Sequence, residues 1–346
     1  MKSSQPQTLI QRVLIVGGGS LGKRHIAVVR ESLPSAEIGL FSKSGRVNPK
    51  CDFSIKRLED MGDFKPQLAI ITSSADRHME DAIFLARKGI HLLIEKPLSI
   101  NADRVQELIE LRDKHKLTIT VAYNMRYLPS MRKLRDILQK GTLGRLLHIR
   151  VDVGQYLGDW KAEVGYRQSV SASAHRGGGV LFELSHELDY LRWLFGPLDV
   201  LSANLFHKSD LDLDVEDLAM TTLLFRDSER YTPIPINVTM DFCRRSCHRT
   251  CTIYGSEGTA EWDGMNQALH FFDGDTKQST TIVEGSAGCR HASYLRQFST
   301  FVKSIRFGQP VGCSIEEGLG TIELINTIRR KSGFRAPGEA SKYFDV

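Results

Sequence analysis

Cysteine is scarce in this 346-residue sequence, and long apolar runs are missing. Six cysteines in a chain of this length are too few for a disulfide framework. No stretch approaches the roughly 18–20 consecutive apolar residues that a membrane-spanning helix needs. Residues 1–12 show neither the apolar core of a signal peptide nor a twin arginine. These absences predict a cytoplasmic protein with no membrane partner.

A strong excess of one charge is also absent. The 46 basic and 41 acidic residues leave a net charge of +5, which needs no nucleic-acid partner to explain it. A basic pocket for an anionic cofactor accounts for this mild excess equally well, and no nucleic-acid recognition motif or basic stripe is present. The 41% hydrophobic and 25% charged fractions are ordinary for a globular protein. The length suggests two domains.

The first third of the chain alternates short apolar runs with helical patterns. The expected strands are 12–16, 38–42, 68–72, 91–94 and 118–122, and the expected helices are 21–32, 77–88 and 101–116. Strands that alternate with helices indicate a parallel sheet covered on both faces. This pattern predicts a doubly wound α/β nucleotide-binding domain over residues 1–122.

The pattern changes in residues 123–346, which we expect to form a catalytic and oligomerisation domain. Helices are expected at 130–140, 180–195, 293–307 and 315–331. Strands are expected at 146–153, 215–225, 235–242, 249–254 and 259–262, with a turn at 255–258. Strands that follow one another through hairpins give a largely antiparallel sheet. The fold class predicted here is therefore α+β, with a large, mostly antiparallel open sheet.

A glycine-rich turn follows the first expected strand. Gly17, Gly19 and Gly22 form a G-x-G-x-x-G pattern that also includes Ser20 and Leu21. The first glycine permits the tight turn, the second lets the backbone approach a pyrophosphate, and the third lets the helix pack closely on the strand. The helix N-terminus then offers free N–H groups to the phosphates. The context of strand and helix favours a dinucleotide site over a merely structural turn.

The end of the second strand bears on the choice of nicotinamide cofactor. An NAD site places a carboxylate there, about 20 residues after the glycines, to bind the ribose 2′-hydroxyl. This sequence has Ser42, Lys43 and Arg46 instead, which suit a 2′-phosphate. We therefore expect NADP to be preferred, with NAD as the alternative. A solvated basic loop explains the same residues without a ligand.

Further motifs extend along the chain. They are His25, His78, the Glu95-Lys96-Pro97 run, and the segments 122–129, 177–189 and 255–259. Together with the glycine turn, these motifs resemble the glucose–fructose oxidoreductase/inositol dehydrogenase (Gfo/Idh/MocA) family. The resemblance implies a Rossmann domain, then a domain whose open sheet often builds homodimers or homotetramers. It also implies reversible hydride transfer between a nicotinamide and a carbinol or ketone of a sugar, cyclitol or nucleotide-linked sugar.

The resemblance implies roles for individual residues as well. Lys96 and His186 serve the reacting hydroxyl, while Thr72, Ser73, His78 and Glu95 lie with Lys96 at the cofactor. Many members have an aspartate four residues before the histidine; here that position is Phe182, and the nearest acid is Glu183. The Glu-Leu-Ser-His variant resembles a subgroup associated with polysaccharide and nucleotide-sugar gene clusters.

The positions of Lys96 and His186 in the predicted elements also bear on their roles. Lys96 ends a parallel strand, where ligands of such sheets bind, although a lone lysine there is usually only solvated. On a single helix, Glu183, His186 and Tyr190 share a face different from that of the leucines. A carboxylate one turn away would orient the imidazole and raise its basicity. The alternative is a buried histidine paired with backbone.

Candidate substrate contacts are less specific. Trp160, Tyr166 and Arg167 lie in the loop-rich stretch before the catalytic helix. Their aromatic rings could stack on sugar faces or bases, and Arg167 or Arg126 could grip a phosphate or carboxylate. Asp189 and Tyr190 complete this set of expected substrate residues. An ordinary loop with an aromatic anchor is the alternative.

Two competing interpretations complete the sequence picture. Cys243, Cys247 and Cys251 recur every fourth residue, but no second ligand cluster follows, so we expect no metal site. A non-catalytic dinucleotide-binding sensor would keep the glycine turn, yet it would not need both Lys96 and His186. The sequence therefore favours an enzyme that acts on a small sugar substrate.

Overall fold

The computed structural model describes residues 9–160, 165–226, 233–283 and 288–335, which belong to two compact units. Residues 1–8, on which the expectation about a signal peptide partly depends, lie outside this range. The first unit contains the chain as far as Asn124 together with Arg290–Leu319. The second contains Met125–Cys289 and the chain from Gly320 onward. The boundary expected after residue 122 assigns residues 290–319 to the second domain, whereas in the structure they belong to the first unit.

The first unit is built on a parallel sheet with the strand order β3-β2-β1-β4-β5-β6. The strands are β1 (Arg12–Val16), β2 (Glu37–Phe41), β3 (Phe53–Ile55), β4 (Leu68–Ile71), β5 (His91–Ile94) and β6 (Ile119–Val121). The order reverses between β1 and β4, which is where ligands bind in doubly wound sheets. The predicted Rossmann architecture is thereby confirmed, with the short β3 as an additional strand.

The helices of this unit pack on the sheet through buried apolar side chains. α1 (Ser20–Ser32) and α8 (Cys289–Phe307) share a buried core with β1, β2 and β4. α2 (His78–Ala86) packs on β4, on β5 and on α3 (Val105–His115). The central strands are buried on both faces, as a covered parallel sheet requires.

The second unit contains an eight-stranded sheet with the order β14-β13-β12-β11-β7-β10-β9-β8. The strands are β7 (Leu146–Gly154), β8 (Leu198–Phe206), β9 (Leu218–Phe225), β10 (Ile234–Asp241), β11 (His248–Gly255), β12 (Gly258–Asp263), β13 (Ala268–Asp273) and β14 (Ser279–Val283). Every pairing is antiparallel except β10 with β7. The predicted large, mostly antiparallel sheet is confirmed.

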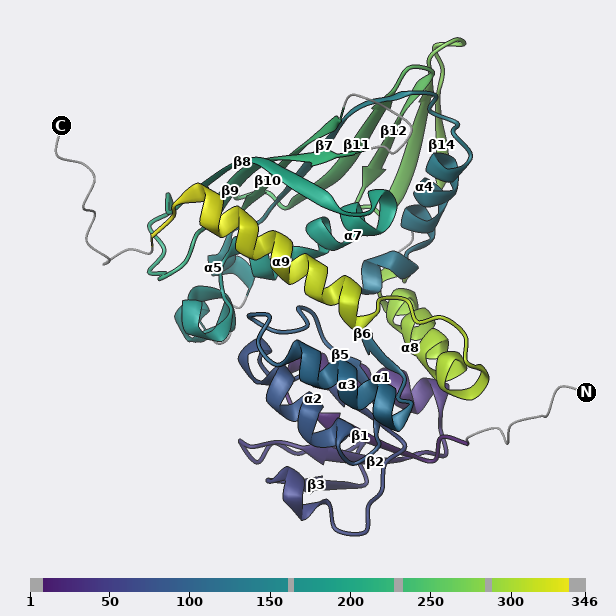
Figure 1. Cartoon of the computed structure of the whole chain (residues 1–346), viewed down its shortest axis with the longest axis vertical. Helices are drawn as coiled ribbons and strands as arrows, with labels where there is room; N and C mark the ends of the chain where they lie inside the picture. The colour runs from purple at the N-terminus through teal and green to yellow at the C-terminus, as the bar shows by residue number, and fades with distance from the viewer. Residues whose placement is uncertain (1–8, 161–164, 227–232, 284–287, 336–346) are drawn as a thin grey trace, which may run out of the picture. The chain divides into compact units, whose positions relative to one another are not determined.

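Figure 1 shows helices gathered on one side of this sheet. They are α4 (Pro129–Gln139), the short α6 (Val180–Glu183), α7 (Ser185–Phe195) and the later turns of α9 (Ile315–Ser332), and their apolar side chains join the core of the second unit. Short α5 (Leu157–Trp160) lies in the loop-rich stretch after β7. Strand side chains of the opposite face include exposed Met220, Asn237 and Arg150. We call this opposite side of the sheet the open face.

Several expected elements differ in the structure. The helix expected over 180–195 is two helices, because the backbone at Leu184 leaves helical geometry with φ −99° and ψ 25°. The strand expected from residue 215 begins at Leu218, since the Glu216 and Asp217 carboxylates are engaged in loop contacts. Strands β8, β13 and β14 were not expected. None of the described helices combines the length and apolar character that crossing a bilayer requires.

Candidate active site

The glycine turn joins β1 to α1 in a very tight space. Gly17 has φ +113°, and a Cβ there would lie 2.7 Å from the Thr72 carbonyl carbon. A Cβ on Gly22 would lie 1.9 Å from the Gly17 carbonyl oxygen. The Thr72 hydroxyl donates to the carbonyls of Val16 and Gly17, at 3.0 Å each. Only glycine fits at Gly17 and Gly22, and this geometry suits a backbone cradle for a pyrophosphate.

The loop after β2 lies directly beside this turn. The Arg46 N–H donates to the buried Ser42 hydroxyl at 3.0 Å, which folds the loop back on itself. A Cβ on Gly18 would contact Arg46 Cβ at 3.1 Å, and one on Gly19 would lie 3.9 Å from Arg46 Nη1. The guanidinium therefore lies at the dinucleotide turn, and Lys43 is exposed on the same loop. Together these residues could receive an additional phosphate.

At the end of β5, a buried acid–base pair supports the next loop. Glu95 Oε1 lies 2.7 Å from His25 Nε2 of α1, and the two side chains are 3% and 1% exposed. Glu95 Oε2 accepts the Lys96 N–H at 3.1 Å. Burial by itself would raise the pKa of Glu95, but the bonds and charges of His25 and Lys96 outweigh it and hold this pKa below its ordinary value. The carboxylate thus faces inward, as a support for Lys96.

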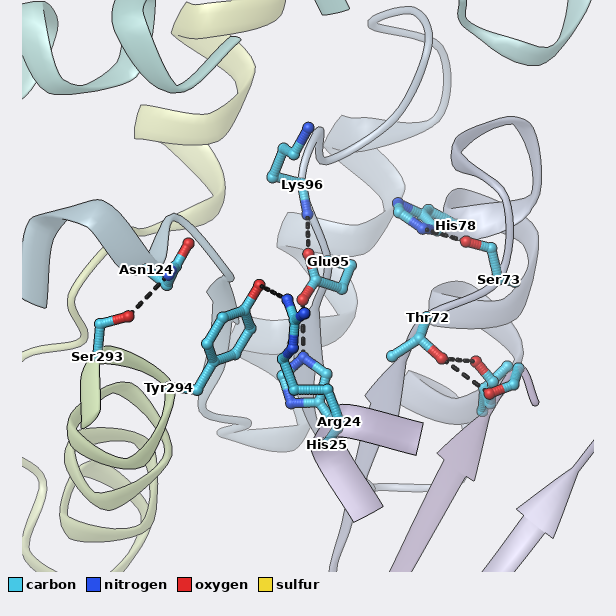
Figure 2. Close-up of polar contacts among 12 residues, drawn as sticks. Arg24, His25, Thr72, Ser73, His78, Glu95, Lys96, Asn124, Ser293 and Tyr294 are labelled. Atoms are coloured by element: carbon cyan, nitrogen blue, oxygen red, sulfur yellow. Dashed lines mark hydrogen bonds and ion pairs between the residues drawn. The ribbon is translucent and has the colours of Figure 1, made fainter. Parts of the chain in front are cut away.

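Figure 2 shows the same network reaching α8, which returns from far along the chain. Tyr294 accepts a hydrogen bond from Arg24 at 3.2 Å, and its ring meets the edge of His25 at 5.5 Å. Burial raises the pKa of this phenol. The Asn124 amide donates to Ser293 at 2.8 Å. Tyr294 carried no sequence signal, because its partners lie about 270 residues earlier in the chain.

His78, at the start of α2, contacts the loop after β4, which contains Ser73, and the loop after β5, which contains Pro97. The His78 ring nitrogens lie 2.8 Å from the Pro97 carbonyl and 2.9 Å from the Ser73 carbonyl. The Ser73 hydroxyl donates to buried Asp81 at 2.7 Å. In Figure 2 the Lys96 side chain rises away from the Glu95 carboxylate, at the edge where the strands end. Both loops of the expected cofactor edge are therefore fixed by side chains.

In the second unit, an ion pair fixes the turn that precedes α6. Gly177 and Gly179 have φ +80° and +98°, respectively. Arg329 of α9 donates to the Gly178 carbonyl at 3.1 Å and pairs with Glu216 at 2.9 Å. The Glu216 carboxylate is 2% exposed. This buried anchor sets where the helical segment with the expected reacting histidine begins.

The break at Leu184 changes how Glu183 and His186 are presented. Glu183 ends α6, and its carboxylate accepts the Ser171 hydroxyl at 2.8 Å. His186 lies in the first turn of α7. Glu183 and His186 therefore lie on two different helices, and the spacing of a single helix does not place them on one face. Their roles remain a proposal.

Three expected substrate residues are engaged inside the second unit. Arg126 and Asp189 form a two-pronged ion pair at 2.9 and 2.7 Å, with side chains 3% and 1% exposed. Tyr190 is fully buried, with its ring against Trp262 at 5.7 Å, and burial raises the pKa of its hydroxyl. In this structure Arg126 is paired with Asp189, and Tyr190 belongs to the core of the second unit.

The remaining substrate candidates lie in the loop-rich stretch. The Trp160 ring meets the edge of Phe242 at 5.5 Å. Arg167 lies over the Tyr166 ring at 5.1 Å and pairs with Asp212 at 3.2 Å, but both charged side chains are mostly exposed. Such an exposed pair holds its geometry weakly. Arg167 could therefore exchange Asp212 for an anionic ligand.

The cysteines of the β10–β11 region are separated in the structure. Cys251 is buried, and burial raises its pKa to about 12. Cys247 is exposed, while Cys243 is half-buried in the loop after β10. Within the described ranges, no group of His, Cys, Asp and Glu side chains has the arrangement of a metal site. These thiols carry no argument for metal chemistry.

Comparison with known proteins places this geometry in a family. Residues 11–123 match the model described as "Oxidoreductase family, NAD-binding Rossmann fold", and residues 135–335 match "Oxidoreductase family, C-terminal alpha/beta domain". Myo-inositol 2-dehydrogenase of Thermotoga maritima is 24% identical over 270 residues, which is 72% of each chain. At this level of identity, the specific reaction of a relative does not transfer to this chain.

Solved structures show the same fold. A levoglucosan dehydrogenase in complex with NADH superposes with a TM-score of 0.78 at 20% identity, over 93% of this chain and 97% of that chain. The WlbA dehydrogenase of Bordetella pertussis, in complex with NADH and UDP-GlcNAcA, gives 0.77 at 18% identity, over 96% and 100%. At these identities, both resemblances concern the fold alone.

Proposed function

Because the chain belongs to the Gfo/Idh/MocA family of oxidoreductases, we propose that it is an NAD(P)-dependent dehydrogenase or reductase of a sugar. Its target is a CH–OH or keto group on a sugar, cyclitol or nucleotide-linked sugar. The observation that carries this proposal is the edge of the parallel sheet. There a glycine cradle ends β1, and Lys96, supported by the buried Glu95–His25 pair, follows β5.

Each reacting group has a definite task in this proposal. A bound nicotinamide supplies or accepts the hydride. Lys96 hydrogen-bonds the substrate oxygen, and its charge stabilises the developing alkoxide. His186 removes the hydroxyl proton during oxidation and returns it during reduction. Glu183, whose carboxylate accepts the Ser171 hydroxyl, places a negative charge just before the first turn of α7, where His186 lies.

For the cofactor, we propose NADP as the preferred form. The support comes from this chain's own loop, where Arg46 lies at the glycine turn and no carboxylate occupies positions 42–46. The two solved relatives above carry NADH. Those bound cofactors do not decide the preference of this chain, because the residues after β2 determine whether a 2′-phosphate is accepted. NAD remains the alternative cofactor.

Replacing Arg46 by alanine tests this preference. We expect the Kd for NADPH to rise about tenfold, since a charge-assisted contact to the 2′-phosphate is lost. The Kd for NADH should stay within about twofold, because NADH has no such phosphate. Fluorescence titration measures both values, with exposed Lys50→Ala as the control. Equal weakening of both cofactors would assign Arg46 to the shared pyrophosphate instead.

The proposed substrate contacts are Trp160, Tyr166 and Arg167. The aromatic rings offer stacking surfaces, and the exposed Arg167–Asp212 pair can open to receive an anion. A nucleotide-linked or acidic sugar fits this combination. Arg126, Asp189 and Tyr190 are left out of the proposed contact set, because they are satisfied or buried within the second unit.

Absorbance of the reduced nicotinamide provides the test of function. The purified protein is screened with NADP and NAD, in both directions, against free polyols, cyclitols, keto-sugars and nucleotide-linked sugars. Cofactor-linked turnover with at least one sugar class is expected. Tight cofactor binding without turnover of any of them would instead support the non-catalytic sensor.

We also propose that the open face joins identical chains into a homodimer or homotetramer. Its exposed apolar side chains include Met220 at 48% and Phe272 at 41% exposure. Met220→Lys and Phe272→Lys together should lower the molar mass measured by light scattering to that of the monomer. The matched control is Phe307→Lys, which changes a phenylalanine at the end of α8 that is 56% exposed. A monomeric parent protein would exclude this assembly.

A further inference from the structure

A single histidine joins two loops at the proposed cofactor edge. β4 and β5 are neighbouring parallel strands, and each is followed by a loop, one containing Ser73 and the other Pro97. His78, at the start of α2, lies between these loops and is 1% exposed. Figure 2 shows its ring beside Ser73, near the loop that contains Lys96. Because Pro97 directly follows Lys96, anything that holds Pro97 also holds the proposed reacting lysine.

Both nitrogens of the His78 ring contact backbone carbonyl oxygens. Nδ1 lies 2.8 Å from the Pro97 carbonyl oxygen, and Nε2 lies 2.9 Å from the Ser73 carbonyl oxygen. A carbonyl oxygen only accepts hydrogen bonds, whereas a neutral imidazole has a single N–H. A neutral ring would therefore press a nitrogen lone pair against an oxygen lone pair. Turning the ring over would place C–H groups toward both oxygens and would leave the two buried carbonyls without a hydrogen bond from this ring.

We infer that His78 is a doubly protonated positioning residue that ties the loop after β4 to the Lys96–Pro97 loop. It donates one N–H to each carbonyl, so the two strand ends stay at a fixed separation. Only one part of the inference rests on the proposed function, namely that this contact positions Lys96 for the reaction. The protonation state itself follows from the two carbonyl contacts.

A buried anion compensates the charge of this imidazolium. Asp81, on the same helix, is 2% exposed and accepts the Ser73 hydroxyl at 2.7 Å. Burial raises the pKa of Asp81, while Arg77 and His78 act in the opposite direction. Arg77 lies 3.8 Å from Asp81 and 3.4 Å from Glu80. Across the loop, the Glu95 carboxylate is bound to His25 rather than to His78.

The Lys96 backbone is thus held on both sides. On one side, Glu95 accepts the Lys96 N–H at 3.1 Å and is itself bound to His25. On the other side, the Pro97 carbonyl is held by His78. A displacement of a reacting group by about 1 Å costs about a hundredfold in rate. Loss of the His78 tie is therefore expected to affect the chemical step more than cofactor binding.

Nitrogen NMR of histidine-labelled protein at pH 7.5 reads the protonation state directly. In long-range ¹H–¹⁵N correlations, His78 should show two protonated nitrogens, with its signals assigned by their loss in His78→Gln. His91 provides the reference in the same spectrum, because its Nδ1 accepts the Thr118 N–H at 2.8 Å and so carries no proton. Burial also lowers the pKa of His91, which keeps that ring neutral. An unprotonated nitrogen signal from His78 would overturn the inference.

Kinetics of His78→Gln supply the second readout. Glutamine has donors at one end only, so it cannot serve both carbonyls. We expect kcat to fall at least about tenfold while the Kd for NADPH stays within about twofold. Exposed His115→Gln is the matched control. A variant with wild-type kcat would remove the link to Lys96. Should no sugar be turned over by the parent protein, the proposed function fails, while the NMR result still decides the state of His78.

Discussion

Lys96→Ala is expected to lower kcat by about 10²–10³-fold, the usual effect of removing one donor to a developing oxyanion. The Kd for NADPH should change little, because the glycine turn and the loop after β2 hold the cofactor. The Glu95–His25 pair is bonded to the Lys96 backbone N–H and does not need the ammonium group. Stopped-flow absorbance and fluorescence titration measure the two quantities separately.

Two further variants make the Lys96 result specific. Lys96→Met keeps the length of the side chain without its charge, so a loss equal to that of Lys96→Ala would attribute the effect to the ammonium. Exposed Lys88→Ala, in the same unit, controls for a general change in surface charge. If Lys96→Ala retains near-normal turnover, Lys96 has no part in the reaction.

The second large effect is expected on stability. Arg126→Leu would remove the two-pronged ion pair to the Asp189 carboxylate, which is 1% exposed. Breaking a buried ion pair in this way costs about 3–5 kcal/mol, because the remaining charge is uncompensated. The double variant Arg126→Leu/Asp189→Leu should recover most of this loss, since a buried pair can be exchanged for apolar side chains at little cost.

Urea unfolding followed by tryptophan fluorescence is well suited to this test. All three tryptophans, Trp160, Trp193 and Trp262, lie in the second unit, as does the ion pair. The signal therefore reports the unit in which the substitution is made. A single variant that keeps wild-type stability but loses substrate affinity would restore Arg126 to the substrate-binding set.

Elements with strong local patterns could be predicted closely from the sequence. β1 and β5 begin and end where their apolar runs do, and the helices after them differ by a few residues at their ends. The turn at 255–258 separates β11 from β12 as expected. These elements depend on residues close in sequence, such as Gly17 and Gly22, whose requirement for glycine is local.

Features that depend on distant partners could not be predicted in the same way. The return of α8 to the first unit is defined by contacts such as Tyr294 with Arg24 and His25. The inward direction of the Glu95 carboxylate depends on a histidine 70 residues earlier in the chain. Neither glycine nor proline lies at the break at Leu184, so the apolar periodicity predicted one helix across it. Burial of Arg126 against Asp189 is invisible in a sequence, where an arginine simply offers a charge.

Mass spectrometry of the product formed with C4-deuterated NADPH tests the central claim most directly. In the reducing direction, with the deuterium on the transferred face of the ring, the account predicts one deuterium on the carbon of the sugar that becomes the carbinol. Product formed without the label, with both faces of the nicotinamide tested in turn, would contradict hydride transfer and the reaction proposed for Lys96.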